Sequence, residues 1–91
     1  VVARDGTRGD ALIELAAYYQ GQGDTERALF LIERAENLAE YEYPALLEHA
    51  QLLVSKRDYA KAAEVLRRAL QLRQEPRVER FLALVEQSVR P

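Results

Sequence analysis

The 91-residue chain contains no cysteine, no methionine and no tryptophan, and only one histidine, His49. Without cysteine it can form neither a disulfide framework nor a zinc–thiolate site, and it offers no thiol nucleophile. One histidine cannot supply the several ligands of a metal site, and a catalytic histidine needs a positioned partner. We therefore expect a protein that is not an enzyme and that binds neither a metal nor a cofactor.

A basic surplus is also missing, because 13 lysines and arginines face 15 aspartates and glutamates. Proteins that bind nucleic acids usually carry such a surplus, so we expect no nucleic-acid partner. No apolar run approaches the ~20 residues needed to span a bilayer, and we expect no direct membrane contact by this chain. Because the chain neither starts with methionine nor contains one, we expect a soluble piece of a larger protein. The absence of cysteine is compatible with the cytoplasm and with the periplasm, so the compartment stays open.

What the chain does have is helical periodicity. From Asp10 nearly to the end, apolar residues recur three and four positions apart, and no segment alternates as a strand does. The fold is therefore predicted to be all-α. Residues 1–9 lack the periodicity, and we expect a linker or the tail of an upstream element there. Breakers and capping residues predict five helices, over about 10–20, 24–39, 44–55, 58–72 and 76–89.

The helices also repeat, because the first two and the next two form hairpins related by one constant shift in residue number. Asp24 and Asp58 define this repeat shift (58 − 24 = 34), and Ala28 and Ala62 obey it (62 − 28 = 34). The first helices of the hairpins obey it too, which pairs Leu12, Ala16 and Tyr19 with Leu46, Ala50 and Leu53. A fixed period of this size indicates a helical array in which stacking of hairpins supplies the core.

The order of large and small residues within the period resembles the tetratricopeptide repeat. The two repeats read Leu12, Leu15-Ala16, Tyr19, Ala28, Ile32, Ala35 and Leu46, His49-Ala50, Leu53, Ala62, Leu66, Ala69. They depart from the family in having leucine at the tryptophan position, and Glu40 and Gln74 in place of the closing proline. The resemblance implies an αα-hairpin solenoid, a right-handed superhelix with repeats over 10–42 and 43–74 and a capping helix over 75–91.

The last helix does not fit the repeat register. The repeat shift would place Arg80 and Gln87 in the core, whereas the apolar stripe of this helix consists of Val78, Phe81, Leu82, Val85 and Val89. We therefore expect this helix to be rotated or shifted by about one residue. Phe81 is then predicted to be buried against the fourth helix.

His49 occupies the position that Leu15 holds in the first repeat, where we expect an internal packing residue. The neighbouring Glu48 points about 100° away around the helix and cannot readily share a ligand with the histidine. His49 is therefore interpreted as a partly buried, hydrogen-bonded packing residue. A structural pH switch is the alternative.

In the resembled family, the first helix of each hairpin lines a concave groove that receives peptides or helices of partner proteins. Carried over to this chain, the groove residues are Asp10, Ile13, Glu14, Ala17, Gln20, Leu47, Glu48, Gln51 and Val54. An apolar floor with two carboxylates favours an apolar or helical segment that carries a basic residue. None of these positions is basic, so we do not expect the grip on acidic chaperone tails that some family members use.

We therefore expect a non-catalytic protein–protein interaction or scaffolding module. Family habits and the arginine-rich composition suggest a bacterial protein that helps to assemble a secretion, pilus or exopolysaccharide apparatus. The alternatives are self-association as a homodimer, an intramolecular spacer, and an accessory domain of an enzyme. The face of the first helix that an upstream repeat would cover is a further candidate for contact.

Overall fold

The computed structural model describes residues 8–89, and these residues form helices connected by short turns, with no strand among them. The elements are α1 (Arg8–Gly21), α2 (Thr25–Glu36), a 3₁₀ helix η2 (Ala39–Tyr41), α3 (Glu42–Ser55), α4 (Tyr59–Leu72) and α5 (Pro76–Val89). The predicted all-α fold is confirmed.

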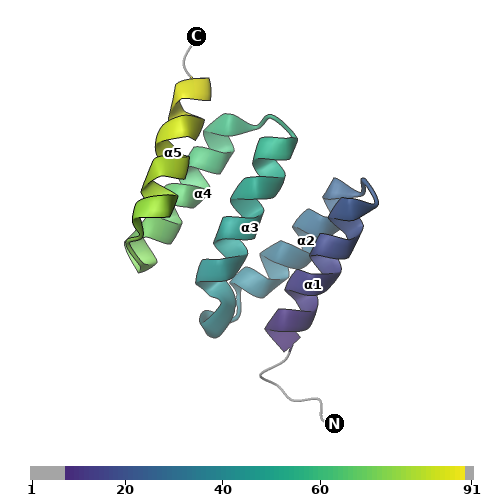
Figure 1. The fold of residues 1–91 in the computed structure, drawn as a ribbon. Helices are drawn as coiled ribbons and strands as arrows, with labels where there is room; N and C mark the ends of the chain where they lie inside the picture. The colour runs from purple at the N-terminus through teal and green to yellow at the C-terminus, as the bar shows by residue number, and fades with distance from the viewer. Residues whose placement is uncertain (1–7, 90–91) are drawn as a thin grey trace.

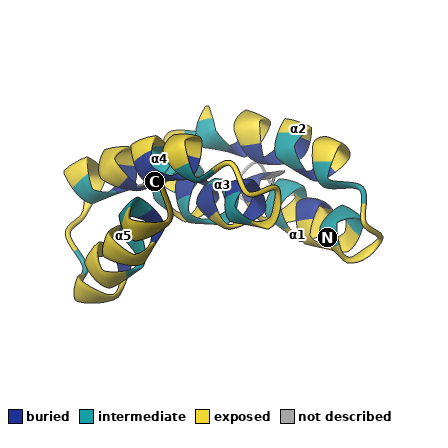
Figure 2. Ribbon diagram, turned by 90° about the horizontal axis from the view of Figure 1, so that it is seen from above, coloured by how far each residue is buried: buried dark blue, intermediate teal, exposed yellow. Residues whose placement is uncertain are grey.

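Each α-helix packs mainly against its neighbours in the chain (Figure 1). α1, α3 and α5 lie on one side of the molecule, and α2 and α4 lie on the other (Figure 2). The described chain measures 50 × 29 × 17 Å, because helices are added side by side along one direction. Such a linear arrangement leaves the outer faces of the first and last helices without a covering helix among the described residues.

The turns inside the two hairpins have the same backbone geometry. Gly23 has a φ of 83°, and Arg57, one repeat shift later, has a φ of 65°. The residue that follows is Asp24 or Asp58, and its N–H donates to a carbonyl oxygen five residues back at 2.9 Å in both turns. Each aspartate then caps the next helix, because its side chain accepts from the N–H three residues on. The repeat is therefore present in the backbone as well as in the sequence.

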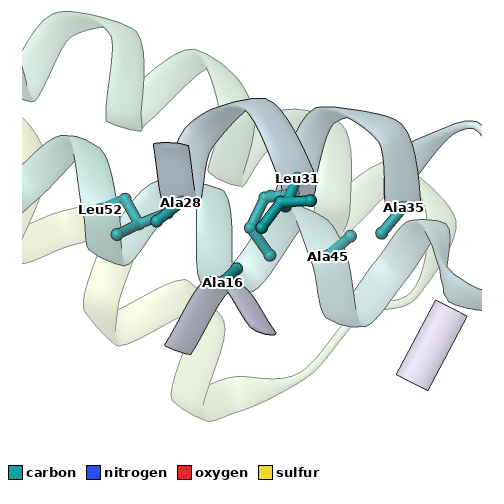
Figure 3. Packing of buried hydrophobic residues seen from close by; sticks show 7 residues of the cluster. Ala16, Ala28, Leu31, Ala35, Ala45 and Leu52 are labelled. Carbon is teal, nitrogen blue, oxygen red and sulfur yellow. The ribbon is translucent and has the colours of Figure 1, made fainter. Parts of the chain in front are cut away.

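The core consists of two clusters of buried apolar side chains. The first joins α1, α2 and α3, and contains Ala16, Ala28, Leu31, Ile32, Ala35, Ala45 and Leu52. The second joins α3, α4 and α5, and contains Ala50, Leu53, Ala62, Ala63, Leu66, Val78 and Val85. Burial of each leucine or isoleucine contributes roughly 1.5–3 kcal/mol. The alanines let the helices approach closely where they cross (Figure 3).

The predicted start of the first helix is wrong by two residues. Most of the expected linker over residues 1–9 lies outside the described residues, but its last two residues belong to α1. Gly9 is buried beneath the ring of Tyr41, where a Cβ atom would overlap the ring. The missing side chain of Gly9 therefore permits a close contact between α1 and η2.

The predicted end of the second helix is also wrong. α2 stops at Glu36 rather than near Ala39, because Leu38 has extended backbone angles of −97° and 114°. The predicted break between the second and third helices, over about residues 40–43, lies instead at residues 37–41, and α3 begins at Glu42. Pro44 does fall in the first turn of α3, where its missing N–H costs no helical hydrogen bond.

The expected shift of the last helix is confirmed. Val78 and Val85 of α5 pack against the preceding hairpin as Ala45 and Leu52 of α3 do. The spacing between these pairs is one position shorter than the repeat shift (78 − 45 = 33 and 85 − 52 = 33). The α5 register is therefore displaced by one residue. The two polar residues that the unshifted register would bury are exposed: Arg80 and Gln87.

Candidate functional site

The strongest candidate site is a depression between α3 and α5, with a volume of about 280 Å³. We call it the α3–α5 depression, and its lining residues are Leu47, Gln51, Glu75, Arg77, Val78 and Phe81. Val78 is buried, while Leu47 and Phe81 are half-buried and pack against the second core cluster. Gln51 and Arg77 are exposed, so polar groups adjoin an apolar floor.

Local sequence rules fix both walls of the depression. Leu47 and Gln51 are four residues apart on α3 and therefore lie on one face of that helix. On the other wall, Pro76 begins α5, and the carbonyl oxygen of Glu75 accepts from the Val78 N–H at 3.1 Å. The start of α5 thus brings Glu75 and Val78 to the same end of the helix.

The charges beside the depression are mixed. The Arg73 Nε lies 3.8 Å from the Glu75 carboxylate, and the Arg73 guanidinium stacks 5.1 Å from the centre of the Tyr43 ring. Burial raises the pKa of Tyr43, and Glu75 raises it further, while Arg73 and Arg77 act in the opposite direction. This arrangement can bind an apolar side chain together with a polar or charged neighbour.

The structure brings only some of the predicted groove residues into this depression. Leu47 and Gln51 line it. Val54, on the same helix, packs against the second core cluster and is half-buried. Glu48 is half-buried and does not line the depression.

None of the predicted α1 residues lines the depression either. Ile13 is half-buried against the first core cluster, and Gln20 is also half-buried. Glu14 and Ala17 are exposed on α1. Asp10 accepts a hydrogen bond from the Tyr41 hydroxyl at 3.4 Å, so it contributes to the contact between α1 and η2.

Sequence reasoning missed the whole α5 wall of the depression. The signal was present, because Val78 and Phe81 belong to the apolar stripe of the last helix. Phe81 was expected to be buried, but it is only half-buried, because part of its ring borders the depression. The sequence could have predicted this wall only if the rotation of α5 had been known, because that rotation places the apolar stripe against α3 as well as α4.

Another hollow lies between α4 and α5, and its volume is about 370 Å³. Its lining residues are Ala60, Ala63, Glu64, Arg67, Glu86 and Val89. The Arg67 guanidinium and the Glu86 carboxylate face each other at 2.9 Å and join the two helices. Although this hollow is larger, two of its charged lining groups already bind each other, so the α3–α5 depression is the better candidate.

His49 has a partner that the sequence did not reveal. Its Nδ1 lies 2.5 Å from a carboxylate oxygen of Glu36 on α2, and both side chains are nearly buried. The predicted partly buried, hydrogen-bonded histidine is thus confirmed. The expected internal position of Leu15 is wrong, because its side chain is 44% exposed and no described helix covers it.

No family model matches the chain, and a search of curated proteins finds no match either. Between residues 8 and 89, no helix has the length and apolarity that a bilayer crossing requires. The class that the fold of residues 8–89 defines is all-α, with five α-helices that pack in neighbouring pairs.

Proposed function

We propose that this chain is a tetratricopeptide-like interaction module, without catalytic activity of its own, that binds a segment of a partner protein in the α3–α5 depression. One observation carries the proposal. Three apolar side chains, those of Leu47, Val78 and Phe81, meet from two helices, and polar side chains adjoin them. A helix-lined apolar depression of this kind suits an anchor residue of a partner.

The size of the depression narrows the type of partner. A volume of about 280 Å³ is at the lower limit of pockets for small ligands, and suits one large side chain better than a cofactor. A leucine, phenylalanine or tryptophan presented by a helix is the expected anchor. The rest of the partner would lie along α3, where Gln51 is exposed.

The charges near the depression favour a basic residue beside the anchor. Glu75 lines the depression and Glu48 lies on the same helix as Leu47. Arg77 is the one basic lining residue, so it would disfavour a second positive charge at its own end. We therefore expect an apolar anchor that has a lysine or arginine on the side of α3.

The experiment is a selection from a displayed library of amphipathic helical peptides, followed by affinity measurements on the best binders. Leu47→Glu places a charge on the floor, and we expect it to weaken binding at least about tenfold. The matched control is Leu84→Glu on α5, because Leu84 is 63% exposed and lies outside the depression. Circular dichroism checks that each variant keeps its helices.

A second pair of variants tests the charge preference without touching the core. Gln51→Glu is expected to strengthen binding of a peptide with a basic residue, and Gln51→Arg is expected to weaken it. If Leu47→Glu and both Gln51 variants leave the affinity unchanged, the proposed site is wrong. A selection that yields no binder would contradict the proposed function itself.

A further inference from the structure

The outer face of α1 carries an apolar stripe with no helix over it among the described residues. We define the outer α1 face by Ala11, Leu15 and Tyr18, which are spaced four and three residues apart. Ala11 is exposed, and Leu15 and Tyr18 are 44% and 58% exposed. The Tyr18 ring packs edge-on against the Tyr19 ring at 5.4 Å, a contact that favours one orientation of Tyr18.

The repeat shows which helix covers the equivalent face of α3. The repeat shift converts the outer α1 face into Ala45, His49 and Leu52 of α3. Ala45 and Leu52 are 0% and 1% exposed because they pack against α2. His49 binds Glu36 of α2. The outer α1 face is therefore equivalent to the face of α3 that packs against the preceding helix, α2.

The direction of the covering helix follows from the same comparison. Leu52 lies beside Ala28, and Ala45 lies beside Ala35 (Figure 3). α2 and α3 thus run in opposite directions along this contact. A helix on α1 would run in the same way, with one alanine near Tyr18 and another, seven residues later, near Ala11.

The chemistry of the covering helix can be read from the difference between α2 and α4. α2 presents Glu36 to His49, whereas α4 has Leu70 at the equivalent position (36 + 34), half-buried against the second cluster. On α1 the histidine position is held by Leu15. A carboxylate placed against Leu15 would lose hydration without gaining a partner, so a leucine is preferred there.

We propose that the outer α1 face docks an amphipathic helix of a partner whose apolar stripe resembles that of α4. This stripe has alanines seven residues apart, a leucine between them and a leucine directly after the second alanine, as in Ala62, Leu66, Ala69 and Leu70. A second copy of the chain cannot supply it from the described helices, because α3 already covers the stripe of α2 and α5 covers that of α4. The inference does not rest on the α3–α5 depression, which lies at the other end of the row of helices.

The test joins a second copy of α4 covalently to the chain, so that its apolar stripe meets α1 at a high effective concentration. Residues 42–75 are placed directly before residue 8 of the described chain, so that the added copy of α4 can pack on the outer α1 face as α2 packs on α3. The added α4 then ends three residues before α1, which is the separation that the chain itself has between α4 and α5. We expect a single unfolding transition with a midpoint at least about 5 °C above that of the unextended chain, and reduced solvent access at Tyr18.

Two matched variants separate the proposed chemistry from a general effect of length. Extension with residues 8–41 instead places Glu36 of the added hairpin against Leu15 of the original α1. The rise in the unfolding midpoint should then be smaller. In that second extended protein, Leu15→His in the original α1 recreates the His49–Glu36 pair. It should restore the full rise in the unfolding midpoint. Leu15→Glu in the first extended protein should abolish the rise in the unfolding midpoint. Leu84→Glu, at an exposed position of α5, should leave that rise unchanged.

Three results would overturn the proposal. One is an added hairpin that unfolds separately while the original midpoint stays unchanged. Another is a gain that survives Leu15→Glu. A third is a dimer of the unextended chain that Leu15→Glu dissociates, which would assign the face to a second copy. If an extended protein aggregates, a peptide of residues 57–74 replaces it: amide shifts at Ala11, Leu15 and Tyr18 on titration support the proposal, and their absence counts against it.

Discussion

The imidazole Nδ1 of His49 lies 2.5 Å from a carboxylate oxygen of Glu36 and ties the first hairpin to the second. The two side chains are 13% and 10% exposed, so water has little access to either group. An ionised carboxylate can only accept a hydrogen bond, so the pair with an ionised Glu36 requires a form of His49 in which Nδ1 carries hydrogen. Each residue thus satisfies a polar group that would otherwise be costly to bury.

The first prediction concerns this pair. His49→Leu leaves the Glu36 carboxylate without its partner, and we expect it to lower the free energy of unfolding by about 1–3 kcal/mol. Adding Glu36→Leu to that variant removes the unsatisfied carboxylate and should recover most of the loss. Urea denaturation of the wild type, both single variants and the double variant gives the coupling. Additive effects of the two substitutions would show that the pair contributes nothing.

The second prediction concerns the left-handed residue in the second hairpin turn. Arg57 has a φ of 65°, a conformation that glycine adopts without steric cost. Arg57→Gly should therefore raise the free energy of unfolding by about 0.5–1 kcal/mol. The reciprocal control is Gly23→Arg, which should lower it by a similar amount because Gly23 has a φ of 83°. Thermal unfolding followed by circular dichroism measures both, and a loss of stability in Arg57→Gly would contradict the prediction.

The third prediction concerns Tyr43, whose hydroxyl oxygen is buried and has no hydrogen-bond partner among residues 8–89. Tyr43→Phe removes this unsatisfied group and keeps the ring. It should leave the stability at pH 7 unchanged or raise it by up to about 1 kcal/mol. Urea denaturation at pH 7 measures the difference, and a clear loss of stability would mean that the hydroxyl has a partner.

The same residue predicts a dependence on alkaline pH. The fold favours the neutral phenol, because burial raises the pKa of Tyr43 above its ordinary value of 10.0. This contribution is fully present below pH 10 and is lost as the pH rises through the folded-state pKa. Above about pH 10, the wild type should therefore lose stability faster than Tyr43→Phe. The free energy of unfolding of both proteins, measured with urea, is compared as a function of pH. Parallel pH dependences would show that Tyr43 titrates alike in the folded and unfolded states.

The fourth prediction tests the one-residue displacement of α5. Val85 is 3% exposed and its neighbour Leu84 is 63% exposed. Val85→Ala should lower the free energy of unfolding by about 1–3 kcal/mol, since it removes buried methyl groups from the second cluster. Leu84→Ala should change it by less than about 0.5 kcal/mol. Equal effects of the two substitutions would mean that α5 has a different rotation.

Much of the fold could be predicted because its signals are local. Asp24 and Asp58 cap helices through contacts three residues along the chain, and such contacts are visible in the sequence. Pro76 likewise marks the start of α5 correctly. The end of α2 was missed, since the residues after Glu36 remain compatible with a helix until η2 is formed. The start of the first helix was placed two residues late, because the contact between Gly9 and the ring of Tyr41 joins residues far apart in the chain.

The candidate site was only half predictable. Leu47 and Gln51 follow from the position of α3 in the repeat, but Glu75, Arg77 and Phe81 depend on how α5 turns as it packs. A helix with an apolar stripe can rotate by one residue and still bury most of that stripe. Which rotation is adopted depends on the fit between side chains of different helices.

The sequence by itself determined the helices, their capping aspartates and the repeat shift, because these depend on residues a few positions apart or on simple repetition. Only the tertiary structure decided that His49 meets Glu36, that Leu15 stays exposed, and that α5 opens a depression beside α3. Each of these depends on which helix lies over a given face. Equivalent positions share a pattern in the sequence, yet they differ in environment wherever the row of helices has an end.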